Sequence, residues 1–223
     1  MKNVIHRFRC LSALAAALLC GVPLHTNAAG MNGAIVFDNG APDHESANNL
    51  GFAWQAEDFT LSSGTSITGF RFWSLEAKDA YRGSISWSIT RALGGTAIAT
   101  GTTDTVRRTG LGEALGLDEY LNELSLAAPL TLGSGTYWLV LHNGHFGDLG
   151  DPNEFLWETT AANGTLRGME SFDGGATWTS NFNEHAFQVS AIPEPASVAM
   201  LVAGMLIVAC TRRRTQPGTR FSR

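Results

Sequence analysis

Two polar stretches of the sequence gather oxygen atoms of the kind that bind calcium. Their members are Asp38, Asn39 and Asp43 in the first stretch, and Asp148, Asp151, Asn153 and Glu154 in the second. Calcium takes about six to eight oxygen ligands from carboxylates, amides and backbone carbonyls. Neither stretch follows the EF-hand spacing, and Asp and Asn are also ordinary turn residues. A structural calcium ion and a plain turn therefore both stay open at each stretch, and we expect no other cofactor.

Aromatic side chains offer a second kind of chemistry, because an exposed ring can stack on the apolar face of a sugar. All six tryptophans lie between residues 54 and 178. Trp87 and Trp138 fall inside apolar alternation, which favours a core position. Four other rings lie near the ends of expected strands, where exposed platforms for glycan contact can form: Trp54, Trp73, Tyr81 and Trp157. Burial in the core is the default alternative for every one of them.

The segment from residue 171 to residue 178 reads SFDGGATW. Every fixed position of the Asp-box pattern Ser-x-Asp-x-Gly-x-Thr-Trp is matched, by Ser171, Asp173, Gly175, Thr177 and Trp178. The segment resembles the Asp-boxes of sialidases and other β-propellers. The resemblance implies a hairpin clamp in which Asp and Thr tie the turn and Trp packs beneath it. A propeller carries several copies, so a single copy predicts an isolated structural hairpin without a catalytic role.

Several classes of enzyme are excluded by what the central part of the chain lacks. The three cysteines are Cys10, Cys20 and Cys210, so residues 29–195 hold no disulfide, thiol nucleophile or thiolate metal site. The sequence contains no Gly-x-Ser-x-Gly elbow and no phosphate-binding loop. We therefore expect no enzyme. A secreted carbohydrate-active hydrolase stays as the alternative, because any two of the 20 acidic residues could form a glycosidase pair.

The charge distribution divides the chain into three parts. Its 223 residues carry a net charge of −5, but all 20 acidic residues and only seven of the 15 lysines and arginines lie between residues 29 and 195. This central block therefore has a net charge of −13. Such an acidic block has no electrostatic footprint for nucleic acid or for an anionic membrane surface. The remaining basic residues lie in the two terminal segments.

The N-terminal segment, residues 1–28, has the pattern of a secretory signal peptide. A basic start (Lys2, Arg7, Arg9) precedes the apolar run Cys10–Val22, and small residues follow up to Ala28. The run is too short for a spanning helix, which needs about 20 residues. We expect export by the Sec translocon and cleavage by signal peptidase after Ala28.

The C-terminal segment, residues 192–214, combines three features. Pro193, Glu194 and Pro195 come first, an uncharged stretch at residues 196–211 follows, and Arg212, Arg213 and Arg214 close it. Sixteen residues make a transmembrane helix of about 24 Å, which snorkelling arginines and a locally thinned bilayer can accommodate. The arginines keep the tail, residues 215–223, in the cytoplasm. An ordinary tail anchor explains the helix and the arginines but not the Pro-Glu-Pro motif.

In this order of motif, helix and arginines the chain resembles the PEP-CTERM family of exported bacterial proteins. The resemblance covers about 25 residues, and the tail after Arg214 is longer than usual. It implies a Gram-negative organism and processing near Pro193–Pro195 by an exosortase. It further implies passage through a membrane-anchored intermediate to the cell surface or the medium, usually alongside exopolysaccharide production.

Alternation of apolar and polar residues predicts the elements that carry these groups. It is clearest at Ser84–Arg91, where three apolar residues alternate with hydroxyls. Further strands are expected at Ala34–Asp38, Trp54–Leu61, Ser66–Trp73, Thr96–Thr103, Thr136–Asn143, Phe155–Thr160, Thr165–Ser171 and Ala186–Ala191. Within Gly110–Leu126 a helix capped by Asp118 competes with a strand, and we favour the strand because a helix of about seven residues is marginal alone.

These elements predict one all-β domain at residues 29–191, an antiparallel β-sandwich that is jelly-roll-like. The expected function is that of a non-enzymatic surface or matrix protein associated with exopolysaccharide. A purely structural matrix subunit is a further alternative.

Overall fold

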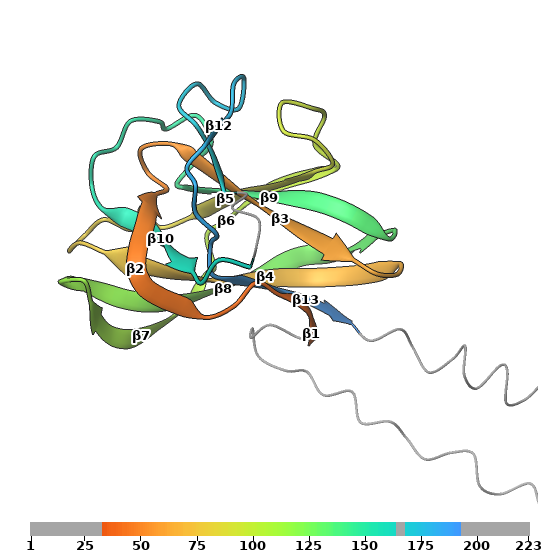
Figure 1. The fold of residues 1–223 in the computed structure, drawn as a ribbon, viewed down its shortest axis with the longest axis horizontal. Helices are drawn as coiled ribbons and strands as arrows, with labels where there is room; N and C mark the ends of the chain where they lie inside the picture. The colour runs from red at the N-terminus through yellow and green to blue at the C-terminus, as the bar shows by residue number, and fades with distance from the viewer. Residues whose placement is uncertain (1–32, 164–167, 193–223) are drawn as a thin grey trace, which may run out of the picture.

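The computed structural model describes residues 33–163 and 168–192, and within these ranges every regular element is a β-strand. Two antiparallel sheets face each other in two layers (Figure 1). The predictions of an all-β fold and of two antiparallel sheets are confirmed. No helix in this part of the chain is long and apolar enough to cross a membrane. The expected signal peptide, the Pro-Glu-Pro motif, the helix at 196–211 and the arginine cluster lie outside the described residues.

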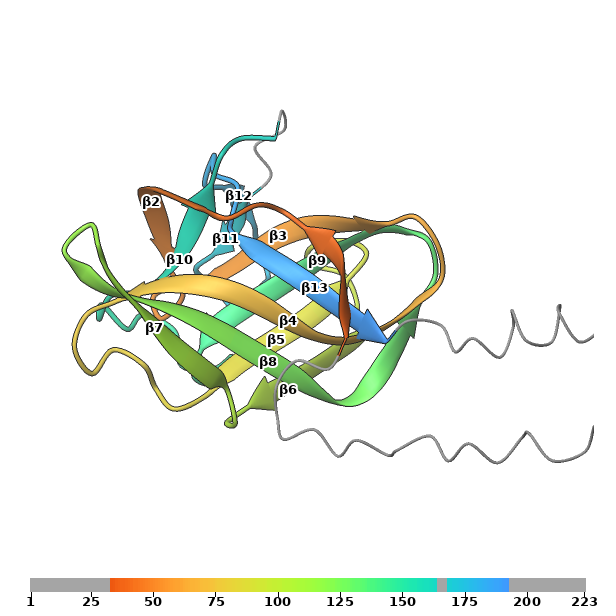
Figure 2. The same ribbon diagram turned by 90° about the horizontal axis from the view of Figure 1, so that it is seen from below.

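The larger sheet has seven strands and is seen from its outer side in Figure 2. Its central strand is β4 (Thr65–Glu76), which pairs with three others: β8 (Leu117–Leu132), β10 (Phe155–Thr160) and β13 (Phe187–Ile192). The sheet is completed by β1 (Ala34–Asp38) beside β13, β2 (Pro42–Asn49) beside β10, and β7 (Arg107–Ala114) beside β8.

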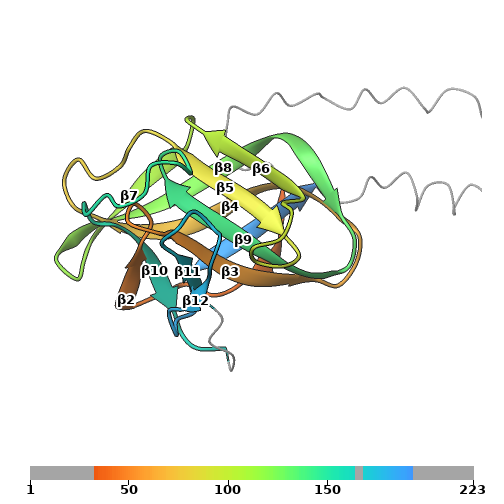
Figure 3. The same cartoon turned by 90° about the horizontal axis from the view of Figure 1, so that it is seen from above.

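The smaller sheet has six strands and is seen from its outer side in Figure 3. Its order is β12 (Thr179–Ser180), β11 (Met169–Ser171), β3 (Trp54–Leu61), β9 (Gly135–Asn143), β5 (Ile85–Thr90) and β6 (Ala99–Thr103). Two loops stand above this sheet in Figure 1, the β5–β6 loop and the β11–β12 loop. The two loops rise from different strands, so they border the part of the outer face of the six-stranded sheet that lies between them.

The core between the sheets is built by strict alternation. In β5, Ile85, Trp87 and Ile89 point inward and are buried, so Ser88 and Thr90 belong to the outer face. Phe70 and Phe72 of β4 face them from the other layer and are fully buried. Rings from the two layers meet, for example Phe70 and Trp87 at 6.0 Å between centroids. A core of this kind needs no disulfide.

Most of the expected strands occur: of the strand expected at Thr165–Ser171 the described part forms β11 at Met169–Ser171, and the short strand β12 was not expected. Two differences are larger. Strand β2 was not predicted: its sequence PDHESANN has no apolar alternation, because it is a polar strand at the edge of its sheet. The doubtful stretch holds two strands instead of one. The turn between β7 and β8 lies at Leu115 and Gly116, whose φ angles are 51° and 82°. The favoured strand at residues 118–124 is confirmed as part of β8.

The two ends of the described body lie side by side. Ala34 at the start of β1 pairs with Ala191 near the end of β13. Gly33 lies so close that an added Cβ would be 2.4 Å from the Ala191 carbonyl oxygen. The segments that precede and follow the sandwich are therefore attached at one edge of the seven-stranded sheet.

Candidate functional site

A groove of about 250 Å³ lies on the outer face of the six-stranded sheet, between the two raised loops. Strands β5, β6 and β9 form its floor with Ser88, Thr90, Thr100 and Val140. The β5–β6 loop, the β11–β12 loop, the start of β3 and the β9–β10 loop form its walls. The wall residues are Trp54, Leu93, Gly94, Gly95, Ala97, Phe146, Gly174, Gly175 and Trp178. Three aromatic rings and three hydroxyl groups therefore line one hollow.

The Asp-box builds one of these walls. Its ends pair as the β11–β12 hairpin, in register Met169 to Ser180 and Glu170 to Thr179. Asp173 closes the turn by accepting hydrogen bonds from the Thr177 backbone N–H at 2.9 Å and the Thr177 hydroxyl at 2.6 Å. The Trp178 indole N–H donates to the Gly175 carbonyl at 3.0 Å. The turn thus fixes the orientation of the Trp178 ring at the edge of the groove.

The charge of Asp173 is stabilised within this turn. Hydrogen bonds from the side chain and backbone of Thr177, with one from the Ser171 hydroxyl, lower the pKa of Asp173 to about 2. The Ser171 hydroxyl in turn accepts from the Gly175 N–H at 2.7 Å. The carboxylate is therefore ionised at any physiological pH and serves the turn.

Trp54, at the start of β3, joins the turn to the β9–β10 loop. Its indole N–H donates to the Phe146 carbonyl at 3.0 Å, and the two ring centroids lie 4.2 Å apart. Gly175 lies against the same indole: an added Cβ would be 2.6 Å from Trp54 Cζ3. Gly175 also has a φ of 87°, a conformation that glycine adopts without strain. The site needs glycine at this position for both reasons.

The chemistry of the groove is neutral. None of its lining residues is acidic or basic, so the groove itself does not supply the two carboxylates that glycoside hydrolysis uses. The Thr100 hydroxyl donates to the Trp87 carbonyl at 3.1 Å, which leaves its oxygen as an acceptor on the outer face. Aromatic faces with a few hydroxyls suit a neutral, hydroxyl-rich ligand.

The other aromatic residues proposed from the sequence lie elsewhere. The expectation for Trp157 is wrong: it is fully buried, its indole N–H donates to the Ala186 carbonyl at 2.9 Å, and its ring stacks on His185 at 4.5 Å. Trp73 is half-buried on the outer face of the opposite sheet. These two residues therefore take no part in the groove.

Tyr81 lines a separate hollow formed by the segment after β4 together with residues of β7 and β8. The Arg108 guanidinium lies over its ring at 4.2 Å, and the Phe155 ring lies 5.8 Å away. Arg108 also lies 4.2 Å from the ring of Tyr120 and pairs with Glu76. The ring of Tyr81 therefore contacts protein groups and offers no free platform for a sugar.

The second stretch of acidic residues pairs with the guanidinium of Arg82. Arg82 Nε lies 2.6 Å from Asp151 Oδ2, and Arg82 Nη1 lies 3.9 Å from Asp148 Oδ2. Hydrogen bonding from the Asn153 backbone, with a further contribution from Arg82, lowers the pKa of Asp151. A guanidinium at this place opposes a calcium ion, and the carboxylates of this stretch do not converge on one point.

The side chains of the first stretch make separate contacts with other parts of the protein. Asp38 accepts from the Gly40 N–H at 3.0 Å, and Asp43 accepts from the Glu45 N–H at 3.0 Å. The Asn39 amide donates to the His185 carbonyl at 3.0 Å. Asp38 and Asp43 therefore accept hydrogen bonds within turns, the plain alternative to calcium, whereas Asn39 joins its turn to the segment before β13. Among the described residues, the acidic and histidine side chains that do converge are His44, Glu119 and Glu158.

Some groups near the groove could not be found from sequence patterns. Phe146 and the β5–β6 loop reach the groove only through the folding of distant strands. Phe52 and Phe172 are about half exposed and contact each other edge-on at 5.9 Å. Because Phe172 begins the Asp-box loop, this exposed pair extends the aromatic surface on that side of the molecule. An aromatic residue beside a turn motif is the signal that could have indicated it.

One buried polar pair connects the two layers. His185 Nδ1 lies 3.0 Å from Glu57 Oε2, which also accepts from the His185 backbone N–H at 2.9 Å. Both side chains are fully buried, and His185 Nε2 lies 3.1 Å from Asn48 Oδ1. Because both ring nitrogens are engaged, the pair holds β3 against the segment before β13 and is not arranged for proton transfer to a ligand.

Neither the protein-family models nor the curated proteins compared with this chain give a match.

Proposed function

We propose that this chain is an exported, non-enzymatic β-sandwich of the jelly-roll type that binds a neutral stretch of exopolysaccharide in the groove above its six-stranded sheet. The observation that carries the proposal is the composition of the groove. The rings of Trp54, Phe146 and Trp178 and three hydroxyl groups line one uncharged hollow. This combination matches the apolar face and the hydroxyl edge of a sugar ring.

The size of the groove and the charge of the domain narrow the range of possible ligands. A groove of about 250 Å³ is smaller than the pockets of about 300–1,000 Å³ that enclose drug-sized ligands. It therefore suits one sugar ring of a chain that continues over the surface. Residues 29–195 carry a net charge of −13, so a highly acidic polysaccharide would be repelled. The size of the groove therefore favours a single sugar ring, and the charge of the domain favours a neutral one.

The two terminal segments of the sequence support the proposal that this binding occurs at the cell surface or in the extracellular matrix. The signal peptide directs the chain through the Sec translocon, and the Pro-Glu-Pro motif, apolar helix and arginines make it an exosortase substrate. Strand β13 ends at Ile192, one residue before Pro193, so the sandwich would stand directly at the processing site. We propose a membrane-anchored intermediate that is then processed and passed to the cell surface or the extracellular matrix.

Affinity electrophoresis through gels that contain the neutral polysaccharide of the producing bacterium tests the binding. We expect retardation of the wild-type chain and at least a tenfold weaker interaction for Trp178→Ala. Trp73→Ala is the matched control, because it removes the same side chain from the opposite sheet. Equal retardation of all three proteins would contradict the groove, and an absence of retardation would support a purely structural subunit.

A further inference from the structure

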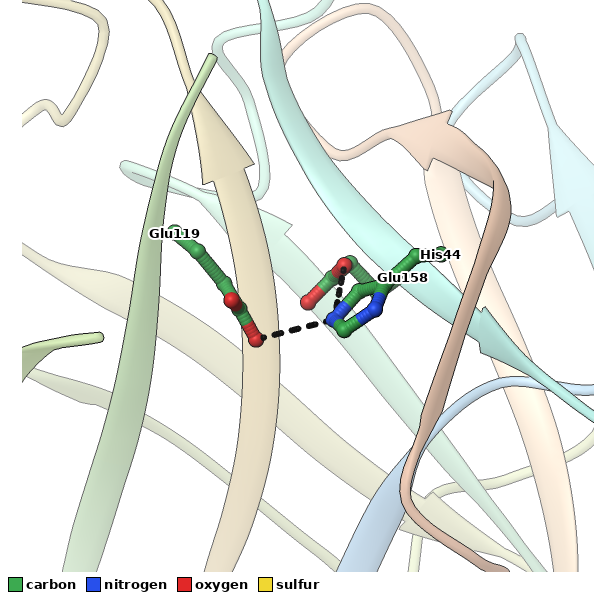
Figure 4. A group of neighbouring side chains, drawn as sticks. All are labelled: His44, Glu119 and Glu158. Atoms are coloured by element: carbon green, nitrogen blue, oxygen red, sulfur yellow. Dashed lines mark hydrogen bonds and ion pairs between the residues drawn. The ribbon is translucent and has the colours of Figure 1, made fainter. Parts of the chain in front are cut away.

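Three side chains from three strands meet on the outer face of the seven-stranded sheet. His44 comes from β2, Glu119 from β8 and Glu158 from β10, and Figure 4 shows their polar ends pointing toward one another. His44 Nε2 lies 3.4 Å from Glu119 Oε1 and 4.0 Å from Glu158 Oε1. One donor atom from each residue lies within 4.8 Å of the others.

Glu158 is the unusual member of this group. Its side chain is fully buried, and neither carboxylate oxygen has a hydrogen-bond partner among the described residues. A buried carboxylate without a partner is strongly unfavourable. Burial, with additions from Glu119 and Asp43 and opposition from His44, raises the pKa of Glu158 to about 7. The fold therefore keeps a buried acidic group aimed at a histidine and a second carboxylate, at a place where a bound metal ion would relieve its charge.

The chain builds a special backbone to place the histidine. Between Glu158 and Thr160 of β10 the partner residues on β2 change from Ala47 to Pro42, so several residues of β2 bulge out of register. His44 lies in this bulge with a φ of 57°, a conformation that few non-glycine residues adopt. The Thr159 hydroxyl lies 2.7 Å from Asp43 Oδ1, which fixes the bulge next to His44. His44 is thus held over Glu158 by the strand itself.

We propose that His44, Glu119 and Glu158 bind a divalent transition-metal ion, with zinc as the best fit. Tetrahedral zinc with bonds of about 2.0–2.2 Å has ligand atoms about 3.4 Å apart, which is the separation of His44 Nε2 and Glu119 Oε1. Glu158 Oε1, at 4.0 Å from His44 Nε2 and within 4.8 Å of the Glu119 donor atom, has to close in by about 0.6 Å or more to complete the set. One imidazole nitrogen with two carboxylates favours zinc over calcium and magnesium, which prefer all-oxygen sites.

The surroundings allow an ion to enter. The His44 side chain is 51% exposed, whereas those of Glu119 and Glu158 are 12% and 0% exposed. Water can therefore occupy the fourth position of a tetrahedral ion on the solvent side, while the two carboxylates hold the ion from beneath. Binding would tie the polar edge strand β2 to β8 and β10, so its direct consequence is stabilisation of the sandwich.

Isothermal titration of the full-length, chelator-treated chain in detergent with ZnCl₂ at pH 7.5 tests the proposal. We expect one zinc ion per chain, bound at least tenfold more tightly than Ca²⁺ or Mg²⁺, and a rise in the unfolding temperature. Glu158→Gln should weaken zinc binding at least tenfold. Glu45→Gln is the matched control: it removes the same charge from an exposed neighbour in the same bulge and should bind like the wild type.

A second variant covers the case in which Glu158→Gln perturbs the fold. His44→Gly removes an exposed ligand and places glycine, which tolerates positive φ, at that position, so the sandwich should fold while zinc binding falls at least tenfold. Zinc binding that is unchanged in both variants, or equally lost in Glu45→Gln, would overturn the assignment. So would a wild-type chain that binds no zinc.

Discussion

A Cβ added to Gly175 would lie 2.6 Å from the Cζ3 atom of Trp54, so the Asp-box turn and strand β3 touch without space for a side chain. This contact links a turn motif to the wall of the groove. The motif acts here as a support: it orients Trp178 and fits against Trp54, and none of its residues needs to react with a ligand.

Gly175→Ala should damage both stability and binding. Alanine at a φ of 87° is strained by about 1–2 kcal/mol, and its methyl group must displace the Trp54 ring. We expect the free energy of unfolding, measured by urea denaturation, to fall by about 2 kcal/mol or more. Gly133→Ala is the control, because an added Cβ there meets no atom within 4 Å. Equal stability of the two variants would contradict the contact.

The pKa of Asp173 provides a test that depends on the turn alone. Its folded-state pKa of about 2 lies below the ordinary value of 3.8, so the turn is stabilised above pH 4 and loses this contribution as the pH falls through about 2. Carboxyl NMR of the folded protein should show a midpoint near 2. Thr177→Val, which removes the hydroxyl that donates to Asp173, should raise the midpoint. A wild-type midpoint near 3.8 would show that the clamp is absent.

The buried pair of Glu57 and His185 should contribute strongly to stability. Glu57→Ala leaves the His185 backbone N–H and Nδ1 without their acceptor inside the protein. Each buried donor without an acceptor costs about 1–3 kcal/mol. We expect Glu57→Ala to lower the free energy of unfolding by at least about 3 kcal/mol, whereas the exposed Glu45→Ala should change it by less than about 0.5 kcal/mol. A small effect of Glu57→Ala would mean that water replaces the acceptor.

The sorting proposal predicts a change in location. Replacement of Pro193, Glu194 and Pro195 by alanine should leave the protein in the inner-membrane fraction as an unprocessed form, because the exosortase would no longer recognise it. Immunoblots of cell fractions from the producing bacterium measure this directly. Alanine substitution of Thr215, Gln216 and Pro217 in the tail is the control. Unchanged processing and location of the first variant would refute the exosortase proposal.

The alternation of apolar and polar residues was sufficient to predict most of the strands. Ser84–Arg91 predicts β5 because the neighbouring layer buries one side of it, and the turn residues between strands follow the same logic. Alternation fails where a strand has no apolar side, as in β2. It is ambiguous at Phe155–Thr160, where apolar residues occupy both faces and the buried side is chosen by packing against Phe72 and Phe187. Trp157 was proposed as an exposed ring from its place near a strand end, and this packing buries it instead.

Less of the candidate site could be predicted from the sequence. The Asp-box was visible because its residues are consecutive, and Trp54 was among the proposed rings. The groove itself depends on Phe146 and on the β5–β6 loop, which reach Trp178 only when four strands are in register. His44 and Glu119 are 75 residues apart in the chain, so only the folded sheet shows that they meet beside Glu158.

The central claim is that the groove between Trp54 and Trp178 binds a neutral sugar segment. The most direct measurement follows the indole N–H resonances of the six tryptophans in ¹⁵N-labelled protein during titration with neutral fragments of the producer's exopolysaccharide. The resonances of Trp54 and Trp178 should shift to saturation, while those of Trp73 and the buried Trp157 stay in place. Absence of any shift, or a shift of Trp73 with Trp178 unchanged, would contradict the account.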